Sequence, residues 1–345
     1  MEKVTVIGID LAKGIFEVSL KAADGGVVGR RRLKRGAFER FMVKAPRVLV
    51  GLEAGPGAHY WARWLAAQGF AVKVMSPRAV RAYRAGPHKS DALDADAVGE
   101  AATRAGVRAV PVKSEAAQAL QAVVRVRARR VGERTRVLNQ LRGLMLEFGI
   151  AASGNLLVRY PRLAGTPAFA ALPERARRLF DELIEEARML DRSVEVRERE
   201  IVEAVRADPL AVRLMSAPGI GPINAAQLVA RIVEPGDFEH ARAMPAYVGL
   251  VPRLIASGKT RRLGPITKHG PADLRKGLVL SGHVIASAAM RCPDKHDPLY
   301  DFARRLIAKG KPRKVVAVAV ANKLARVVCA MLRTGQPYNP RRSAA

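Results

Sequence analysis

Four carboxylates have the residue type and the positions needed to bind metal ions. Asp10 ends the apolar segment VTVIGID, and Glu53 ends a second apolar segment, RVLVGLE; both segments have the composition of buried β-strands. If these strands are neighbours in one sheet, both side chains can project from the same edge. Asp91 and Asp94 lie three residues apart in HKSDALDADAV, a predicted helix, and this spacing places them on one helix face. We therefore expect three segments of the chain to bring four carboxylates together.

Carboxylate oxygens suit Mg²⁺, which needs few protein side chains once water and phosphate complete its shell. A pair of Mg²⁺ ions about 4 Å apart can stabilise the attacking and the leaving oxygen of a phosphodiester. Each acid also has a simpler interpretation, because Ser90 or Asp91 can cap a helix and Glu53 can be an ordinary loop residue. Asp96 is two residues from Asp94, points elsewhere, and is left out of the predicted site.

The segment ASGKTRRLGPITKHG, residues 256–270, is predicted to be a basic loop around Ser257. Ser257 either donates one hydrogen bond to a bound phosphate or attacks a DNA phosphate as a nucleophile. Composition alone favours the first role, because no activating His–Asp pair is visible in the loop and the role of His269 is open. The basic side chains predicted to bind phosphate are Lys259, Arg261, Arg262, Lys268 and Arg275.

The sequence PGIGP, residues 218–222, separates two predicted helices. Gly219 and Gly221 would let the backbone approach a phosphate, and the N-terminus of the following helix favours an anion. This arrangement resembles a helix-hairpin-helix contact to the DNA backbone, although a plain tight turn has nearly the same sequence.

Charge is the strongest signal in the composition. The 345 residues include 60 Lys and Arg against 31 Asp and Glu, a formal net charge of +29, and the excess is greatest near the two ends of the chain. Such a balance favours a nucleic-acid partner over a membrane surface, since no amphipathic anchor accompanies it. We expect no signal peptide, membrane helix, disulfide framework or zinc site, because the N-terminus reads as a strand, the apolar runs are short and only Cys292 and Cys329 are present. These features fit a cytoplasmic protein.

Three segments of different character predict an α/β domain followed by helical domains. Residues 1–112 read as three antiparallel strands, then strand, helix, strand and helix, which indicates a mixed sheet with helices on its faces. Residues 113–206 read as two long helices with apolar residues three, four and seven apart, typical of a coiled-coil arm for oligomerisation; the alternative is a helical insertion packed on its own domain. Residues 207–345 are predicted to be mostly helical.

Several motifs in this order resemble the transposases of the insertion sequence 110 family and their relatives, the pilin-gene invertases. GIDLAK, GLEAGPG and KSDALDADAV resemble the family's RuvC-like four-acid site, with Asp10, Glu53, Asp91 and Asp94 as its members. PGIGPINAAQLVA, AYVGLVPR and SGKTRRLGPITKHGPADLRK resemble the family's C-terminal transposase domain. The resemblance covers nearly the whole chain. It departs from the family at Pro271, where Asn is common, and at Ala256, where many members have another serine.

The resemblance implies a ribonuclease-H-like N-terminal domain and a coiled-coil middle. It implies that the four acids bind Mg²⁺ and that Ser257 attacks DNA to form a covalent phosphoserine link, in a site assembled from both domains of a dimer or tetramer. It also implies a structured non-coding RNA that pairs with target and donor DNA, leaving the protein to recognise backbone and shape. The alternatives are a metal-dependent DNA junction nuclease that needs no Ser257, and a non-catalytic nucleic-acid-binding scaffold.

Overall fold

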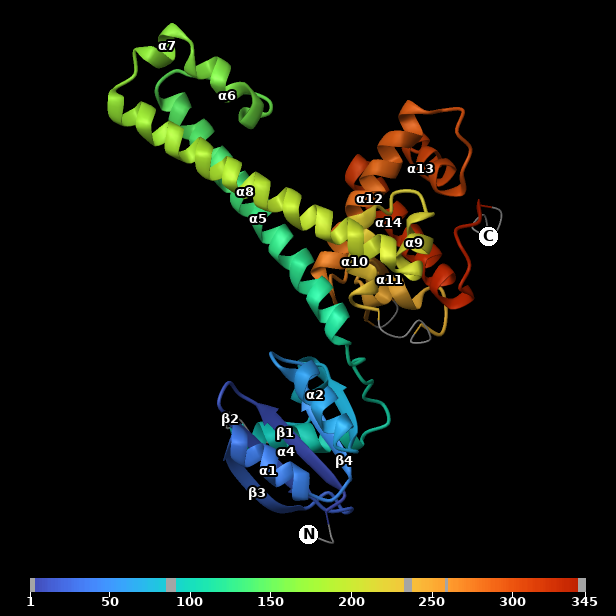
Figure 1. Ribbon diagram of the computed structural model, residues 1–345. Helices are drawn as coiled ribbons and strands as arrows, with labels where there is room; N and C mark the ends of the chain where they lie inside the picture. Colours follow the sequence, from blue (N-terminus) through green and yellow to red (C-terminus); the bar gives the residue numbers. More distant parts are fainter. Residues whose placement is uncertain (1–3, 85–90, 233–237, 258–259, 341–345) are drawn as a thin grey trace. The chain divides into compact units, whose positions relative to one another are not determined.

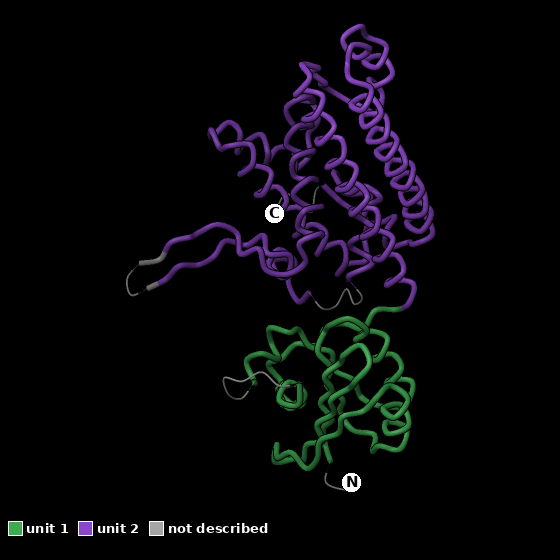
Figure 2. The backbone as a smooth tube through the Cα atoms, turned by 90° about the vertical axis from the view of Figure 1, so that its left-hand side faces the viewer, with its two compact units in different colours: residues 1–114 green, residues 115–345 purple. Residues whose placement is uncertain are grey.

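A computed structural model describes residues 4–84, 91–232, 238–257 and 260–340, without the side chains of residues 257, 260 and 261. Contacts within the chain divide it into two compact units, residues 1–114 and 115–345 (Figure 2). Each unit has its own hydrophobic core, and each is described separately below.

The first unit is built on a five-stranded mixed sheet with the order β3-β2-β1-β4-β5. β1 pairs antiparallel with β2 and parallel with β4, and β4 pairs parallel with β5. The predicted strands and the mixed sheet are confirmed. The strands are β1 (Val6–Leu11), β2 (Ile15–Lys21), β3 (Val27–Lys34), β4 (Leu49–Glu53) and β5 (Ala71–Met75).

Helices cover both faces of this sheet (Figure 1). On one face, α1 (Arg35–Lys44), which the sequence did not predict, and α2 (Ala58–Ala67) pack their aromatic side chains against β2, with the rings of Phe16 and Phe38 stacked 4.5 Å apart. On the other face, α4 (Asp91–Thr103) crosses β1 and β4, and the short helix α3 (Pro77–Arg81) lies beside it. The functional residues predicted for this unit lie on the face that α4 covers.

The second unit begins with the two predicted long helices, α5 (Glu115–Glu147) and α8 (Glu174–Ala207), which pack along each other and are joined by α6 (Leu156–Ala164) and α7 (Pro167–Ala170) (Figure 1). Two long helices are thus confirmed. Among the apolar residues spaced three, four and seven apart, however, Phe148 and Leu179 are exposed. Phe148 lies just after the end of α5, and Phe180 and Ile184 take the buried face of α8 in place of Leu179.

The rest of the second unit is helical around one central helix, α14 (Arg313–Thr334). By length and composition α14 is apolar enough to cross a membrane, contrary to the expectation from the sequence; its apolar side chains, however, fill the core of this unit. That core also includes Val124 of α5 and Ile201 of α8. The other helices are α9 (Pro209–Met215), α10 (Pro222–Val229), α11 (Ala243–Tyr247), α12 (Ala272–Arg291) and α13 (Pro298–Ala308).

The segment predicted to be a basic loop forms an antiparallel hairpin instead, with β6 (Pro252–Ser257) paired to β7 (Thr260–Ile266). The prediction failed because Gly, Pro and basic residues dominate the segment and hide the strand-forming residues Leu254, Ile255 and Leu263, which lie exposed on the hairpin.

Candidate active site

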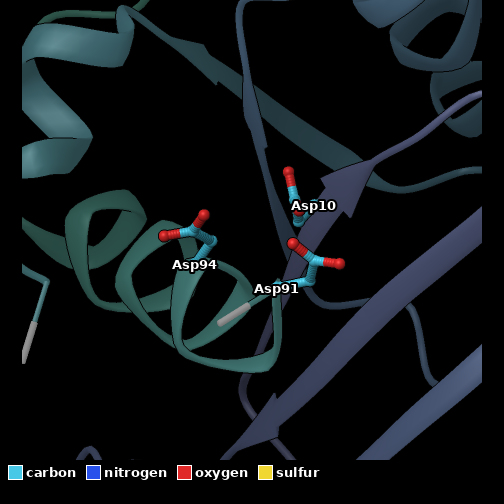
Figure 3. Close-up of side chains that lie close together, drawn as sticks. All are labelled: Asp10, Asp91 and Asp94. Carbon is cyan, nitrogen blue, oxygen red and sulfur yellow. The ribbon is translucent and has the colours of Figure 1, made fainter. Parts of the chain in front are cut away.

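Three carboxylates from two elements converge at the end of β1. Asp10 of β1 and Asp91 and Asp94 of α4 each offer an oxygen, and these oxygens all lie within 4.8 Å of one another (Figure 3). Asp94 is buried, Asp10 is partly exposed and Asp91 is exposed. The structure therefore brings together three of the four acids predicted from the sequence.

Strand alternation explains why Asp10 faces α4. Ile7 and Ile9 point into the core with α1 and α2, so Gly8 and Asp10 point to the opposite face. The same alternation holds in β4, where Val50 and Leu52 belong to that core. The register pairs Gly8 with Gly51 and Ile9 with Leu52, so Asp10 and Glu53 follow at the same level of neighbouring parallel strands.

Glycines in β1 and β4 let α4 lie close enough to the sheet to place Asp91 and Asp94 near Asp10. A Cβ atom on Gly8 would lie 2.2 Å from the carbonyl oxygen of Ala95, and one on Gly51 would lie 2.9 Å from the carbonyl oxygen of Val98. Only glycine at these positions lets the helix backbone rest on the strands. The first turn of α4, with Asp91 and Asp94, consequently lies over the strand ends.

Glu53 joins the cluster through Arg84, a residue that the sequence did not single out. The Arg84 Nε atom lies 2.8 Å from Asp94 Oδ1, and its Nη2 atom lies 3.7 Å from Glu53 Oε2. Arg84 follows α3, which starts at a proline and is capped by the Ser76 hydroxyl. The guanidinium thus supplies positive charge among the four acids.

Burial and neighbouring negative charges raise the pKa of Asp10. Burial first, and then the carboxylates of Asp94, Asp91 and Glu53, raise the pKa of Asp10 to about 6, while Arg84 opposes the shift. A cation among these oxygens would relieve the repulsion that Arg84 only partly offsets. Converging carboxylates are also the hard ligands that a divalent ion such as Mg²⁺ accepts, so the residues present fit such an ion.

Asp96 takes no part in the cluster, as predicted. Its carboxylate accepts hydrogen bonds from the Ser19 hydroxyl at 2.6 Å and from Arg30 Nη2 at 2.7 Å. The two-residue offset from Asp94 turns it toward β2 and β3, where it anchors the other side of α4.

Ser257 ends β6, and its backbone pairs with Thr260 of β7. The side chains of Ser257 and Arg261, and all of Lys259, lie outside the described residues. Arg262 and Lys268 are exposed, whereas the Arg275 guanidinium donates hydrogen bonds to the carbonyl oxygens of Val248 and His269.

Two glycines that the sequence analysis did not single out close the base of this hairpin. Gly249 and Gly270 both have left-handed backbones; a Cβ atom on Gly249 would lie 2.3 Å from the His269 carbonyl oxygen, and one on Gly270 would lie 1.9 Å from that of Tyr247. Arg275 bonds across the same junction. The hairpin that carries Ser257 is therefore firmly attached to the helical unit.

Gly219 and Gly221 occupy the predicted turn between α9 and α10, but in different environments. Gly219 has a left-handed backbone and packs on α12, where its carbonyl oxygen accepts a hydrogen bond from the Ser281 hydroxyl at 2.6 Å. A Cβ atom on Gly221 would meet nothing within 4 Å. Packing accounts for the glycine at 219, and the backbone at Gly221 stays open to an approaching group.

Known proteins are similar in sequence to both units. A transposase family of the IS110 DEDD type matches residues 7–150, and the transposase IS116/IS110/IS902 family matches residues 211–300. A probable family 20 transposase of Pseudomonas aeruginosa is 39% identical over 339 residues, which are 97% of this chain and 98% of that protein. The chain belongs to the IS110 family of transposases. The transposase for insertion sequence element IS1328 of Yersinia enterocolitica is 33% identical over 98% of this chain and its own full length.

Membership of the IS110 family makes the chain an enzyme of the transposase class, as the sequence motifs predicted. The first IS110 match contains Asp10, Glu53, Asp91 and Asp94, and the second contains Ser257. A pilin gene-inverting protein of Moraxella bovis is 26% identical over 129 residues, 37% of this chain and 38% of that protein.

Proposed function

We propose that this enzyme excises and integrates its own insertion sequence by cleaving and exchanging DNA strands. The observation that carries the proposal is the convergence of Asp10, Asp91 and Asp94 within 4.8 Å, in a chain homologous to transposases over nearly its full length. The five-stranded mixed sheet with its acids at the strand ends supports a RuvC-like, ribonuclease-H-like fold for residues 1–112. Residues 113–206 would serve as a coiled-coil oligomerisation arm and residues 207–345 as the transposase domain.

Asp10, Asp91 and Asp94, with Glu53, would hold Mg²⁺. Bound Mg²⁺ ions stabilise negative charge on the attacking and leaving oxygens of a phosphodiester. The chain itself holds the carboxylates in position, because the backbone of α4 packs directly on glycines of β1 and β4. Arg84 balances the carboxylates of Glu53 and Asp94 and keeps the cluster compact before metal binds.

Ser257 would be the nucleophile, in agreement with the family resemblance. Its hydroxyl oxygen forms a bond to phosphorus, the bond from phosphorus to the leaving strand breaks, and the hydroxyl proton ends on the leaving oxygen. The result is a covalent phosphoserine link whose energy is kept for rejoining. Gly249, Gly270 and Arg275 attach the base of the hairpin to the helical unit, which supports this role because it limits where the hairpin can carry Ser257.

Basic residues would hold the nucleic-acid backbone around this centre. The net charge of +29 supports DNA as substrate and a structured guide RNA as partner. Gly221 offers an open backbone to a phosphate, and a dimer or tetramer would complete the site. A cytoplasmic, nucleoid-associated location in a prokaryote fits this activity. The side chains proposed to contact phosphate are Lys259, Arg261, Arg262, Lys268 and Arg275.

A suicide DNA substrate containing an element end, incubated with protein, the RNA encoded beside the element and Mg²⁺, tests these roles. We expect a protein–DNA adduct that Ser257→Ala abolishes. Full cleavage by Ser257→Ala would instead indicate a junction nuclease that uses water. Unchanged transposition by Asp10→Asn would indicate that the acids are structural and the protein a scaffold.

A further inference from the structure

The second unit contains a cavity of about 730 Å³ between α13, α14 and the segment that follows α14. This volume lies in the range of small-ligand sites, about 300–1,000 Å³. Phe302 of α13 and Tyr338 after α14 line it together with apolar residues of α14. None of its lining residues belongs to the carboxylate cluster or to the β6–β7 hairpin.

Three cations gather on the cavity wall. Arg305 comes from α13, and Lys323 and Arg326 lie one turn apart on α14. Within the described part of the chain, none of the three has a carboxylate within salt-bridge distance. Three cations that line one cavity without a carboxylate partner among the described residues make this wall suited to an anion.

The pKa of Lys323 reflects the same excess of positive charge. Burial, and then the neighbouring Arg305 and Arg326, lower the pKa of Lys323, although Asp297 and Asp301 oppose the shift. Its ammonium group lies over the Phe302 ring, 5.3 Å from the ring centroid, and donates to the Pro298 carbonyl oxygen at 3.3 Å. A bound anion would stabilise the charged form of this lysine.

The segment after α14 is held in place by its own hydrogen bonds. The Tyr338 hydroxyl donates to the buried carboxylate of Asp297 at 2.9 Å, and the Tyr338 amide donates to the Ser216 hydroxyl at 2.8 Å. The chain after α14 is thereby held along the cavity, where the Tyr338 side chain forms part of the lining. Cations and aromatic rings together are the groups that bind the phosphate and the base of a nucleotide.

We propose that this cavity binds one unstacked nucleotide, with its phosphate on Arg305, Lys323 and Arg326 and its base against Phe302 and Tyr338. The nucleotide belongs to a single strand of nucleic acid, or is a free nucleoside monophosphate of the same chemistry. This inference is independent of the proposed cleavage chemistry, since binding here needs neither the carboxylates nor Ser257.

Photo-cross-linking in EDTA, where no Mg²⁺-dependent cleavage occurs, tests the inference on the full-length protein. The probes are a single-stranded oligonucleotide with one iodouracil base, iodouridine monophosphate and the unphosphorylated nucleoside. We expect the oligonucleotide to cross-link to the peptide containing Tyr338 or Phe302. A cross-link by the monophosphate as well would mean that free nucleotides also enter, whereas the nucleoside should not react.

The double variant Arg305→Gln/Arg326→Gln should lower the cross-link yield by at least about tenfold, because the loss of one charge-assisted hydrogen bond alone has about that effect. The control Lys309→Gln/Arg313→Gln removes the same charge from exposed positions of the neighbouring helix ends and should retain the yield. Arg305→Gln alone changes an exposed side chain and guards against misfolding of the double variant. Equal yields in the pocket and control variants, or no cross-link at either aromatic residue, would overturn the proposal.

Discussion

Gly8 of β1 and Gly99 of α4 are in direct backbone contact: a Cβ atom on Gly8 would lie 2.4 Å from the Gly99 amide nitrogen. This contact sets the height of α4 above the sheet, and so the distance from Asp10 to Asp91 and Asp94.

Gly8→Ala should therefore destabilise the first unit strongly, by about 3 kcal/mol, because the nearest atoms are backbone and cannot move aside. Gly14→Ala is the control, since a Cβ atom there would meet nothing within 4 Å, and should change stability by less than about 0.5 kcal/mol. Urea unfolding measures both. Similar midpoints for the two variants would mean that α4 is not held by this contact.

The pKa of Asp10, raised to about 6, predicts a pH dependence of stability without metal. The folded state holds the Asp10 proton more tightly than the unfolded state does, so stability is greatest below the ordinary pKa of 3.8 and is lost as pH rises through about 6. With EDTA present, Asp10→Asn should remove this loss and be more stable than the parent protein at pH 7, but not at pH 4. Parallel melting-temperature curves for the two proteins across this range would refute the assignment.

Mg²⁺ should raise the melting temperature of the protein at pH 7.5, because an ion that binds only the folded state stabilises it. Asp91→Asn should reduce that increase. Asp96→Asn lowers the starting stability by breaking the contacts with Ser19 and Arg30, yet it should keep the full Mg²⁺-dependent increase. A loss of the increase in both variants would point to general charge rather than to a defined cluster.

Arg84 should act as an internal cation while no metal is bound. Arg84→Met removes positive charge 2.8 Å from Asp94, so it should lower the melting temperature in EDTA and enlarge the increase on adding Mg²⁺. Arg81→Met, at an exposed position of α3, is the matched control. Equal increases in melting temperature on adding Mg²⁺ to Arg84→Met and Arg81→Met would show that Arg84 does not act as an internal cation.

Local pattern in the sequence was enough to predict the five strands of the first unit, the two long helices of the second, and the acids of the candidate site. Asp10 and Glu53 were recognisable because each ends an apolar strand, and the spacing of Asp91 and Asp94 gave one helix face. The contacts across the chain were not recognisable in the same way. In the sequence Gly8 is an ordinary strand glycine, and its contact with α4 is visible only in the structure. Arg84 is likewise one of many arginines in the sequence, and only the fold places it beside Glu53 and Asp94.

The β6–β7 hairpin was missed for a related reason. The two strands pair from Pro252 with Ile266 to Ser257 with Thr260, and this pairing is not visible in either strand alone. The Gly and Pro residues of the segment are typical of loops, so a loop was predicted. Leu179 fits the apolar spacing of α8 but is exposed, because spacing alone does not decide between neighbouring helix faces. Contacts with α6 and α7 favour Phe180 instead.

Mn²⁺ bound in place of Mg²⁺ gives the most direct test of the proposed carboxylate centre. An anomalous diffraction map of Mn²⁺-loaded crystals should show a peak in coordination distance of the Asp10, Asp91 and Asp94 oxygens, and the peak should vanish in Asp10→Asn. A fully occupied Mn²⁺ site elsewhere in an active protein, with no peak among these three carboxylates, would contradict the account.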